Sequence, residues 1–267
     1  MWEEDLEDKA RRKVRWLIGI VAAALLVGAG AYWFASRHRA ENAAAAVIVP
    51  SAAPGAASQI QHPLPEGEGG GALPALNDSD PVAHDSLAGV LGQDTVEQFL
   101  VPQNIVRHIV VTVDNLPRRR VAVELRPVKP TAGQPATAVQ GDITTLSEAN
   151  FARYAPLVHV VQGADVKALV LVYRRLYPLF QQAYEDLGYP GKYFNDRMVE
   201  AIDNLLESPE ITTPIQVVQP RVTWEYADAA LESRSAGQKL LIRMGPANAR
   251  IIKAKLRAFR AEIARQP

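Results

Sequence analysis

The longest amphipathic stretch of the chain, residues 165–187, reads DVKALVLVYRRLYPLFQQAYEDL and decides the fold class. Its apolar and aromatic residues recur every three or four positions, the spacing of one face of an α-helix. These residues are Val166, Leu169, Val170, Tyr173, Leu176, Tyr177, Phe180, Tyr184 and Leu187. Gly188 follows where helices commonly end, and Pro178 predicts a kink because the carbonyl of Arg174 loses its hydrogen-bond partner. The stretch predicts a long core helix.

The segments after this helix are also mostly helical. Apolar residues recur at helical spacing in residues 196–206, in residues 235–244 and in the segment that Pro246 opens. Residues 214–226 are extended, but two prolines within them exclude a central strand, because proline has no N–H to donate to a sheet. Only minor extended segments are therefore expected here.

The segments before residues 165–187 complete the domain. The predicted elements are, in chain order, helices after Asp80-Pro81, over residues 94–100 and over residues 102–115, a short strand over 121–125, a loop over 127–135 and a helix over 149–157. Thr145 and Glu148 have the spacing of a capping box ahead of the last of these helices. The sequence thus predicts a mostly α, compact domain of about six or seven helices over residues 74–267.

An uncharged run of 21 residues, Trp16 to Ser36, lies near the N-terminus. As a helix it spans about 30 Å, the thickness of the hydrocarbon core of a bilayer, so we expect a single transmembrane helix over residues 16–36. Five basic residues precede it and two follow it, which predicts a cytoplasmic segment over residues 1–15 and a periplasmic domain. The alternative is a cleaved signal peptide, but its cleavage site needs small residues, and Tyr32, Trp33 and Phe34 stand there instead.

Residues 37–73 are rich in Ala, Pro, Gly and Ser and almost free of large apolar side chains. Such a composition cannot bury a core, so we expect a disordered linker. A flexible chain of this length reaches roughly 35 Å end to end. The predicted domain therefore lies near the membrane without lying on it.

Composition excludes several kinds of site. The chain has no cysteine, which removes disulfides, thiolate zinc sites and cysteine nucleophiles. The five histidines lack metal-ligand spacing, and the acidic residues around position 80 lack the remaining ligands of a calcium loop. Neither a nucleophile elbow nor a phosphate-binding glycine loop occurs. We predict no metal and no cofactor.

The charges of the chain are balanced overall, with 29 basic and 29 acidic residues, but they are unevenly placed. Residues 234–267 carry nine basic residues and one acidic residue, whereas residues 185–210 carry seven acidic residues. Either the basic segment packs beside the acidic one, or it contacts anionic lipid headgroups. A helix-turn-helix that binds nucleic acid is not expected on the periplasmic side of a membrane.

Several runs resemble the signature segments of an uncharacterised bacterial family, domain of unknown function 3014. The runs are Leu73-Pro74-Ala75-Leu76 with Ser79-Asp80, Val113-Asp114-Asn115-Leu116-Pro117-Arg118, Asn150-Phe151-Ala152-Arg153-Tyr154, Leu176-Tyr177-Pro178-Leu179 through Ala183-Tyr184 to Leu187-Gly188-Tyr189-Pro190, Phe194-Asn195-Asp196, and Leu240-Leu241-Ile242-Arg243-Met244-Gly245-Pro246 with Asn248. The resemblance runs from about Leu73 to the C-terminus. It implies membrane-anchored envelope proteins of Gram-negative bacteria with one N-terminal helix and a variable linker, and it implies no activity.

The candidate site consists of polar residues near predicted helix ends. They are Asp114, Asn115, Asn150, Arg153, Tyr154, Tyr189, Tyr193, Asn195, Arg243 and Asn248. One interpretation is a pocket for a ligand or peptide at one end of the domain. The other is a set of caps and interhelix hydrogen bonds, such as Asn195 capping a helix and Arg153 pairing with Asp114.

Two functions follow from these interpretations. The first is an inner-membrane, single-pass protein with a non-enzymatic binding or scaffolding domain. Its expected partners are the bilayer, through residues 16–36, and another envelope protein, with no nucleic acid and the oligomeric state left open. The alternative is a periplasmic enzyme whose site combines Asp114, Arg153, Tyr154 and Tyr193.

Overall fold

A computed structural model describes residues 60–64, 72–120 and 122–265. These residues are mostly helical, as predicted, and contain ten α-helices, of which seven have nine or more residues. The prediction of six or seven helices missed short ones. The predicted cytoplasmic segment, transmembrane helix and most of the linker lie outside the described residues. Within them no single helix is long and apolar enough to cross a membrane, although α6 and α7 pass that test as a pair bent by 87°.

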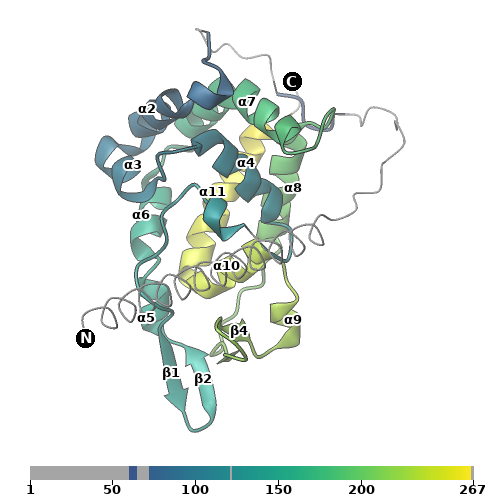
Figure 1. Cartoon of the computed structure of the whole chain (residues 1–267). Coiled ribbons are helices and arrows are strands. Elements are labelled where there is room, and N and C mark those ends of the chain that lie inside the picture. The colour runs from purple at the N-terminus through teal and green to yellow at the C-terminus, as the bar shows by residue number, and fades with distance from the viewer. Residues whose placement is uncertain (1–59, 65–71, 121, 266–267) are drawn as a thin grey trace, which may run out of the picture. The chain divides into compact units, whose positions relative to one another are not determined.

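The helices follow one another in the chain with few strands between them (Figure 1). The α-helices are α2 (Asp80–Leu91), α3 (Gln93–Phe99), α4 (Ile105–Asn115), α5 (Glu148–Ala152), α6 (Ala155–Gly163), α7 (Val166–Asp186), α8 (Phe194–Leu206), α9 (Ala229–Glu232), α10 (Ala236–Met244) and α11 (Pro246–Ile263). Two antiparallel strand pairs accompany them: β1 (Thr137–Gln140) with β2 (Ile143–Leu146), and β3 (Val217–Val218) with β4 (Glu225–Tyr226). The β1–β2 hairpin projects from one end of the helices.

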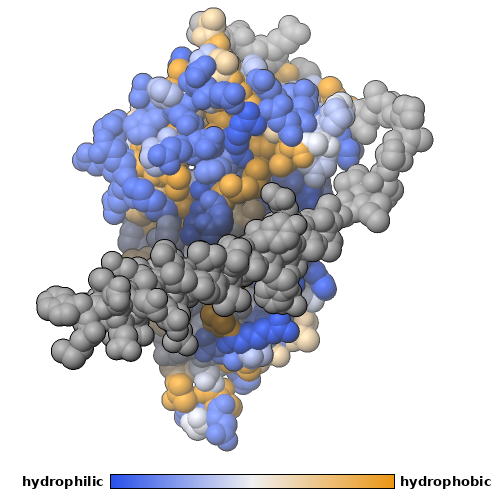
Figure 2. Space-filling model, viewed as in Figure 1, coloured by the Kyte–Doolittle hydropathy of each residue, from blue (hydrophilic) through white to orange (hydrophobic). Residues whose placement is uncertain are grey.

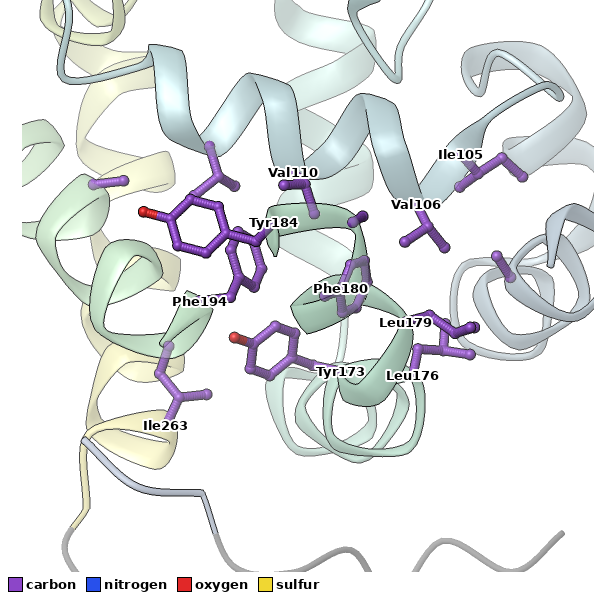
Figure 3. Close-up of a cluster of buried hydrophobic side chains, with 14 of the residues drawn as sticks. Ile105, Val106, Val110, Tyr173, Leu176, Leu179, Phe180, Tyr184, Phe194 and Ile263 are labelled. Carbon is purple, nitrogen blue, oxygen red and sulfur yellow. The ribbon is translucent and has the colours of Figure 1, made fainter. Parts of the chain in front are cut away.

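Helix α7 is the centre of the main core, as its sequence predicts. Asp165 caps it by accepting hydrogen bonds from the backbone N–H groups of Lys167 and Ala168. Its buried side chains, among them Tyr173 and Phe180, pack against α2, α4, α8 and the end of α11 (Figure 3). Pro178 lies inside the helix without ending it. A side chain removed from this face leaves a cavity in the largest core of the domain.

Two smaller apolar clusters extend the core toward the strands. One joins α6, the end of α8, α10 and the start of α11, and the other joins β2, β3 and β4 to α10. At the far end, Val139 and Ile143 of the hairpin are 71% and 49% exposed, and apolar atoms are visible at that end of the molecule (Figure 2). The hairpin thus belongs to the edge of the domain rather than to its core.

The short strand predicted over residues 121–125 is wrong. The described part of this segment contains a 3-10 turn, Val123–Leu125, and Leu125 is 41% exposed. Alternating side chains make a strand only where another strand supplies hydrogen bonds, and no described strand pairs with these residues.

The predicted helix over residues 149–157 is two helices. Thr145 lies in β2, paired with Ala138, so it cannot cap a helix, and Ser147 is the N-cap residue of α5 instead. Pro156 lies in the first turn of α6, where its missing N–H breaks the connection with α5. The capping-box prediction failed because Thr145 belongs to the hairpin, although Glu148 is the first residue of α5.

Residues 60–64, which we call the strap, fall within the predicted linker and are among the described residues. The strap lies on the first turn of α8, where backbone groups of Gln61, His62 and Leu64 are hydrogen-bonded to side chains. Leu64 also packs against the main core. The domain therefore includes a segment that its composition assigns to the linker.

The prediction that the basic C-terminal segment packs beside the acidic one is confirmed. Arg260 Nη2 of α11 donates to Asp203 Oδ2 of α8 at 2.8 Å, and Arg250 Nε donates to Glu210 Oε2 at 2.8 Å. These partly exposed pairs neutralise the two segments locally, and screening by solvent keeps their contribution to the stability small.

Candidate functional site

The predicted site residues fall into separate places. Asp114, Tyr189 and Tyr193 line one hollow of about 630 Å³, which we call the α4–α8 pocket. Its lining residues are Gln61, Asp114, Arg118, Tyr184, Tyr189, Lys192, Tyr193, Asp196, Arg197 and Glu200. The other predicted residues lie at the junction of α5 with α10, in the core, or at the end of α4.

The pocket forms where α4 ends and the chain turns from α7 into α8. Gly188 has a φ of +107°, a conformation that favours glycine, and it ends α7 so that Tyr189 turns back toward α4. The last turn of α4 supplies Asp114, which is 4% exposed, and the first turns of α8 supply Asp196 and Arg197. The end of α4 and the start of α8 thus bring charged side chains to one hollow, and the turn between α7 and α8 adds Tyr189.

Asp114 is the centre of an ion-pair network in this pocket. Arg118 Nη2 donates to Asp114 Oδ2 at 2.8 Å, and Arg197 Nε donates to Asp114 Oδ1 at 3.1 Å. Arg197 also pairs with Glu200, its Nη1 lying 2.7 Å from Glu200 Oε1. Burial alone would lower the pKa of Arg197. The hydrogen bond to Glu200 and the charges of Glu200 and Asp114 together outweigh this effect, so the pKa is raised. Arg197 therefore stays charged at every physiological pH.

Aromatic rings form the other wall of the pocket. The Tyr184 and Tyr189 rings stack with centroids 4.6 Å apart, and Lys192 Nζ lies 5.5 Å from the centre of the Tyr189 ring. Burial raises the pKa of Tyr184 to about 12, and the negative charge of Asp114 adds to the rise. Tyr184 is therefore a neutral phenol near neutral pH and does not act as a base there.

The charged groups of the pocket that keep a donor without an ion pair or hydrogen bond among the described residues are cationic. The carboxylates of Asp114, Asp196 and Glu200 all accept hydrogen bonds or pair with a guanidinium. Among the described residues, Lys192 Nζ has no ion-pair partner, and Arg118 Nη1 makes no hydrogen bond. The sequence analysis did not include Arg118, Lys192 and Arg197 among the site residues. Arg118 could have been found, because it follows Asp114 by four residues, the spacing of an ion pair on a helix.

The α5–α10 junction, formed by Asn150, Arg153, Arg243 and Asn248, holds segments together. Asn150 is fully buried; its Nδ2 donates to the Arg243 carbonyl at 2.9 Å, and its Oδ1 accepts from Arg153 Nη1 at 3.0 Å. Arg153 also donates to the carbonyls of Ala132 and Gly133. Asn248 Nδ2 donates to the carbonyls of Met244 and Phe151. The Asn150 and Asn248 amides thus satisfy carbonyls near helix ends, and Arg153 satisfies carbonyls of the loop before β1.

A second hollow of about 340 Å³ lies beside the junction, between residues 211–215 and the turn from α10 to α11. Asn248 is the predicted site residue that lines it, and its amide is already bonded to two carbonyls. Tyr154 is buried in the cluster of α6, α10 and α11, and burial raises its pKa. Asn115 donates to the Val111 carbonyl at the end of α4.

Asn195 does not cap a helix, contrary to the prediction. Tyr193 is the N-cap residue of α8. Asn195, two residues later, is buried in the first turn of this helix. Its Oδ1 accepts from the Tyr173 hydroxyl at 3.0 Å, and its Nδ2 donates to the carbonyls of His62 and Ile263. The amide therefore joins α7, the strap and the last carbonyl of α11.

The enzyme site suggested by the sequence is not assembled. Asp114 and Tyr193 line the α4–α8 pocket, whereas Arg153 and Tyr154 do not. The expected pair of Arg153 with Asp114 is wrong, since Arg153 bonds to Asn150 and two carbonyls and Asp114 bonds to Arg118 and Arg197. Among the described residues no three His, Asp or Glu side chains lie together as metal ligands.

A family model described as "Protein of unknown function (DUF3014)" matches residues 105–260. The chain belongs to the DUF3014 family. The match begins with the first residue of α4 and ends within α11, a narrower span than the resemblance from Leu73 onward. It includes the lining of the α4–α8 pocket from Asp114 to Glu200, but not Gln61 of the strap. Neither the curated proteins nor the solved structures contain a match to the chain.

Proposed function

We propose that this DUF3014 protein is a non-enzymatic binding domain, tethered to the inner membrane of a Gram-negative bacterium, and that its partner offers an anionic group to the α4–α8 pocket. The observation that supports the proposal is that two cationic side chains of this pocket have donor groups without a partner among the described residues. Lys192 and one edge of Arg118 border a hollow of about 630 Å³ whose carboxylates are already engaged. Arg119 and Arg120, both exposed, extend the cationic surface beside it.

The same network argues against catalysis in the pocket. A general base needs a group that can accept a proton near neutral pH. The Asp114 carboxylate is engaged by two guanidinium groups, and burial keeps Tyr184 neutral with a pKa of about 12. Fixed, paired charges favour orientation of a polar ligand over proton transfer.

The membrane tether is supported by the uncharged run at residues 16–36 and by the larger number of basic residues before it. A reporter fused to the C-terminus tests this part of the proposal. We expect alkaline phosphatase to be active and a cytoplasmic fluorescent reporter to be dark. The opposite pattern contradicts the periplasmic location and leaves the pocket proposal to be judged separately.

A photo-crosslinking residue at position 189 of the full chain, which lines the pocket and leaves Lys192 and Arg118 unaltered, tests the binding proposal in cells. We expect it to capture a defined partner, and we expect Arg118→Gln to reduce the yield at least about fivefold by removing a neighbouring cationic donor. The matched control is a crosslinker at position 175, an exposed arginine position on α7 outside the pocket. Identical products from both positions, or a yield insensitive to Arg118→Gln, contradict the proposal.

A further inference from the structure

The strap is held on α8 almost entirely through its backbone. The Gln61 N–H donates to Asp196 Oδ2 at 3.1 Å, and the His62 N–H donates to Asp196 Oδ1 at 2.7 Å. The Leu64 N–H donates to the Tyr193 hydroxyl at 3.0 Å, and the His62 carbonyl accepts from Asn195 Nδ2 at 2.8 Å. Pro63 has no N–H, so every backbone donor from Gln61 to Leu64 has a partner.

The three side chains that hold the strap lie within four residues at the start of α8: Tyr193 is its N-cap residue, and Asn195 and Asp196 are in its first turn. A carboxylate in the first turn of a helix is favourable because it faces the positive end of the helix dipole. Asp196 uses this position to bind the strap rather than the first N–H groups of its own helix. Asn195 is fixed from behind by Tyr173 and by the last carbonyl of α11. Asn195 is thus held in place by groups other than the strap.

One strap side chain contributes packing. Leu64 is partly buried against the main core, whereas Ile60 at the other end of the strap is 53% exposed. The strap is thus an extended segment that is bound mainly through its backbone. One apolar side chain, in the residue after a proline, packs against the core. Backbone hydrogen bonds supply affinity in such recognition, and the anchored side chain supplies specificity.

We infer that Tyr193, Asn195 and Asp196 form a peptide-binding site for an extended segment with a Pro-apolar pair, and that the chain's own strap occupies it. This inference rests on the strap contacts alone and does not require the proposed anionic ligand. The site borders the α4–α8 pocket, because Gln61, Tyr193 and Asp196 also line that hollow. A segment tethered by a short linker has an effective concentration on the order of millimolar, so an external peptide must compete with the strap.

Hydrogen exchange on the full chain tests the occupied site. We expect the amides of Gln61, His62 and Leu64 to exchange at least about tenfold more slowly than in an unstructured peptide. Asp196→Ala removes the acceptor of the first two amides, and Tyr193→Phe removes the acceptor of the Leu64 amide alone. The matched control is Asp203→Ala, which lies on α8 but pairs with Arg260 instead of the strap. Unprotected strap amides in the unaltered chain, or protection unchanged by Asp196→Ala, overturn the inference.

A peptide with the sequence of residues 58–66 tests whether the site accepts a segment from outside. The double variant Gln61→Pro/Leu64→Ala weakens the strap while leaving the residues of the site unaltered. We expect the peptide to bind this variant at least about tenfold more tightly than the unaltered chain, and a scrambled peptide to bind neither. Equal binding to both proteins overturns the inference. Strap protection that rises with protein concentration also overturns it, because the strap then comes from a second copy.

Discussion

The α4–α8 pocket and the α5–α10 junction contain the same kinds of residue, yet they use them differently. At the junction, Asn150, Arg153 and Asn248 donate to backbone carbonyls, and the chain closes around them. In the pocket, Arg118 and Arg197 pair with the Asp114 carboxylate at the edge of a hollow, and each also donates to the Asp114 carbonyl. Polar residues at helix ends therefore either hold segments together or border a binding surface, and the two are distinguished by the cationic donors that remain without a partner beside the hollow.

The largest effect is expected from Asp114→Ala. The substitution leaves Arg197, whose side chain is 14% exposed, without its buried partner, so we expect the free energy of unfolding to fall by about 3 kcal/mol in urea denaturation. Asp203→Ala, which breaks a partly exposed pair, should cost less than about 1 kcal/mol. Equal losses of unfolding free energy in the two variants would show that the pocket network stabilises the domain no more than a surface ion pair does. That result would contradict the distinction drawn between them.

Alkaline titration separates the two regions through their tyrosines. Burial raises the pKa of Tyr184, beside the pocket, and of Tyr226, beneath Arg243, each to about 12. The folded state therefore keeps these protons between pH 10 and 12 while the unfolded state loses them, so stability is complete below pH 10 and falls as pH rises toward 12. We expect each phenol to contribute roughly 2 kcal/mol to this loss.

The variants Tyr184→Phe and Tyr226→Phe measure the two contributions by thermal unfolding at several pH values. Added salt should distinguish them, since Asp114 adds to the rise at Tyr184 whereas Arg243 opposes it at Tyr226. Salt should therefore lessen the alkaline loss from Tyr184 and enlarge the loss from Tyr226. A salt response of the same sign in both variants contradicts the assignment of opposite neighbouring charges.

Asn150→Ala should destabilise the domain by about 2 kcal/mol. The change leaves the buried Arg243 carbonyl and the Arg153 guanidinium without the amide that joins them. Urea denaturation gives the stability, and photo-crosslinking from position 189 should be unchanged wherever the variant is folded. A loss of crosslinking in folded Asn150→Ala protein shows that the junction also shapes the binding surface.

The smallest effect on stability is expected from Lys192→Gln. Its ammonium group is exposed and has no ion-pair partner among the described residues, so the free energy of unfolding should change by less than about 0.5 kcal/mol. Capture of a partner should nevertheless weaken at least about fivefold when a crosslinker is placed at the neighbouring position 189. A stability loss comparable with that of Asp114→Ala places Lys192 among the structural residues instead.

The helical class and the role of residues 165–187 could be predicted, because apolar periodicity reports directly on a buried helix face. The β1–β2 hairpin could not, because Thr145 and Glu148 also match a helix-capping pattern, and pairing with Ala138 decides between the two. The hollow at Asp114 depends on where the α7–α8 turn places Tyr189 and Lys192. Asn195 looked like a cap because sequence does not record that Tyr173 and Ile263 meet it from other helices.

The strap also determines where a mechanical force enters the domain. If the N-terminal run is held in a membrane, tension along the linker reaches the first turn of α8 before it reaches α2. Two of the four backbone hydrogen bonds there converge on the single carboxylate of Asp196, so this residue receives the first pull. Peeling the strap away would lengthen the tether by residues 60–71, roughly 40 Å when extended, before any core helix is stretched. Under such tension the strap would therefore come away before the core helices of the DUF3014 domain are stretched.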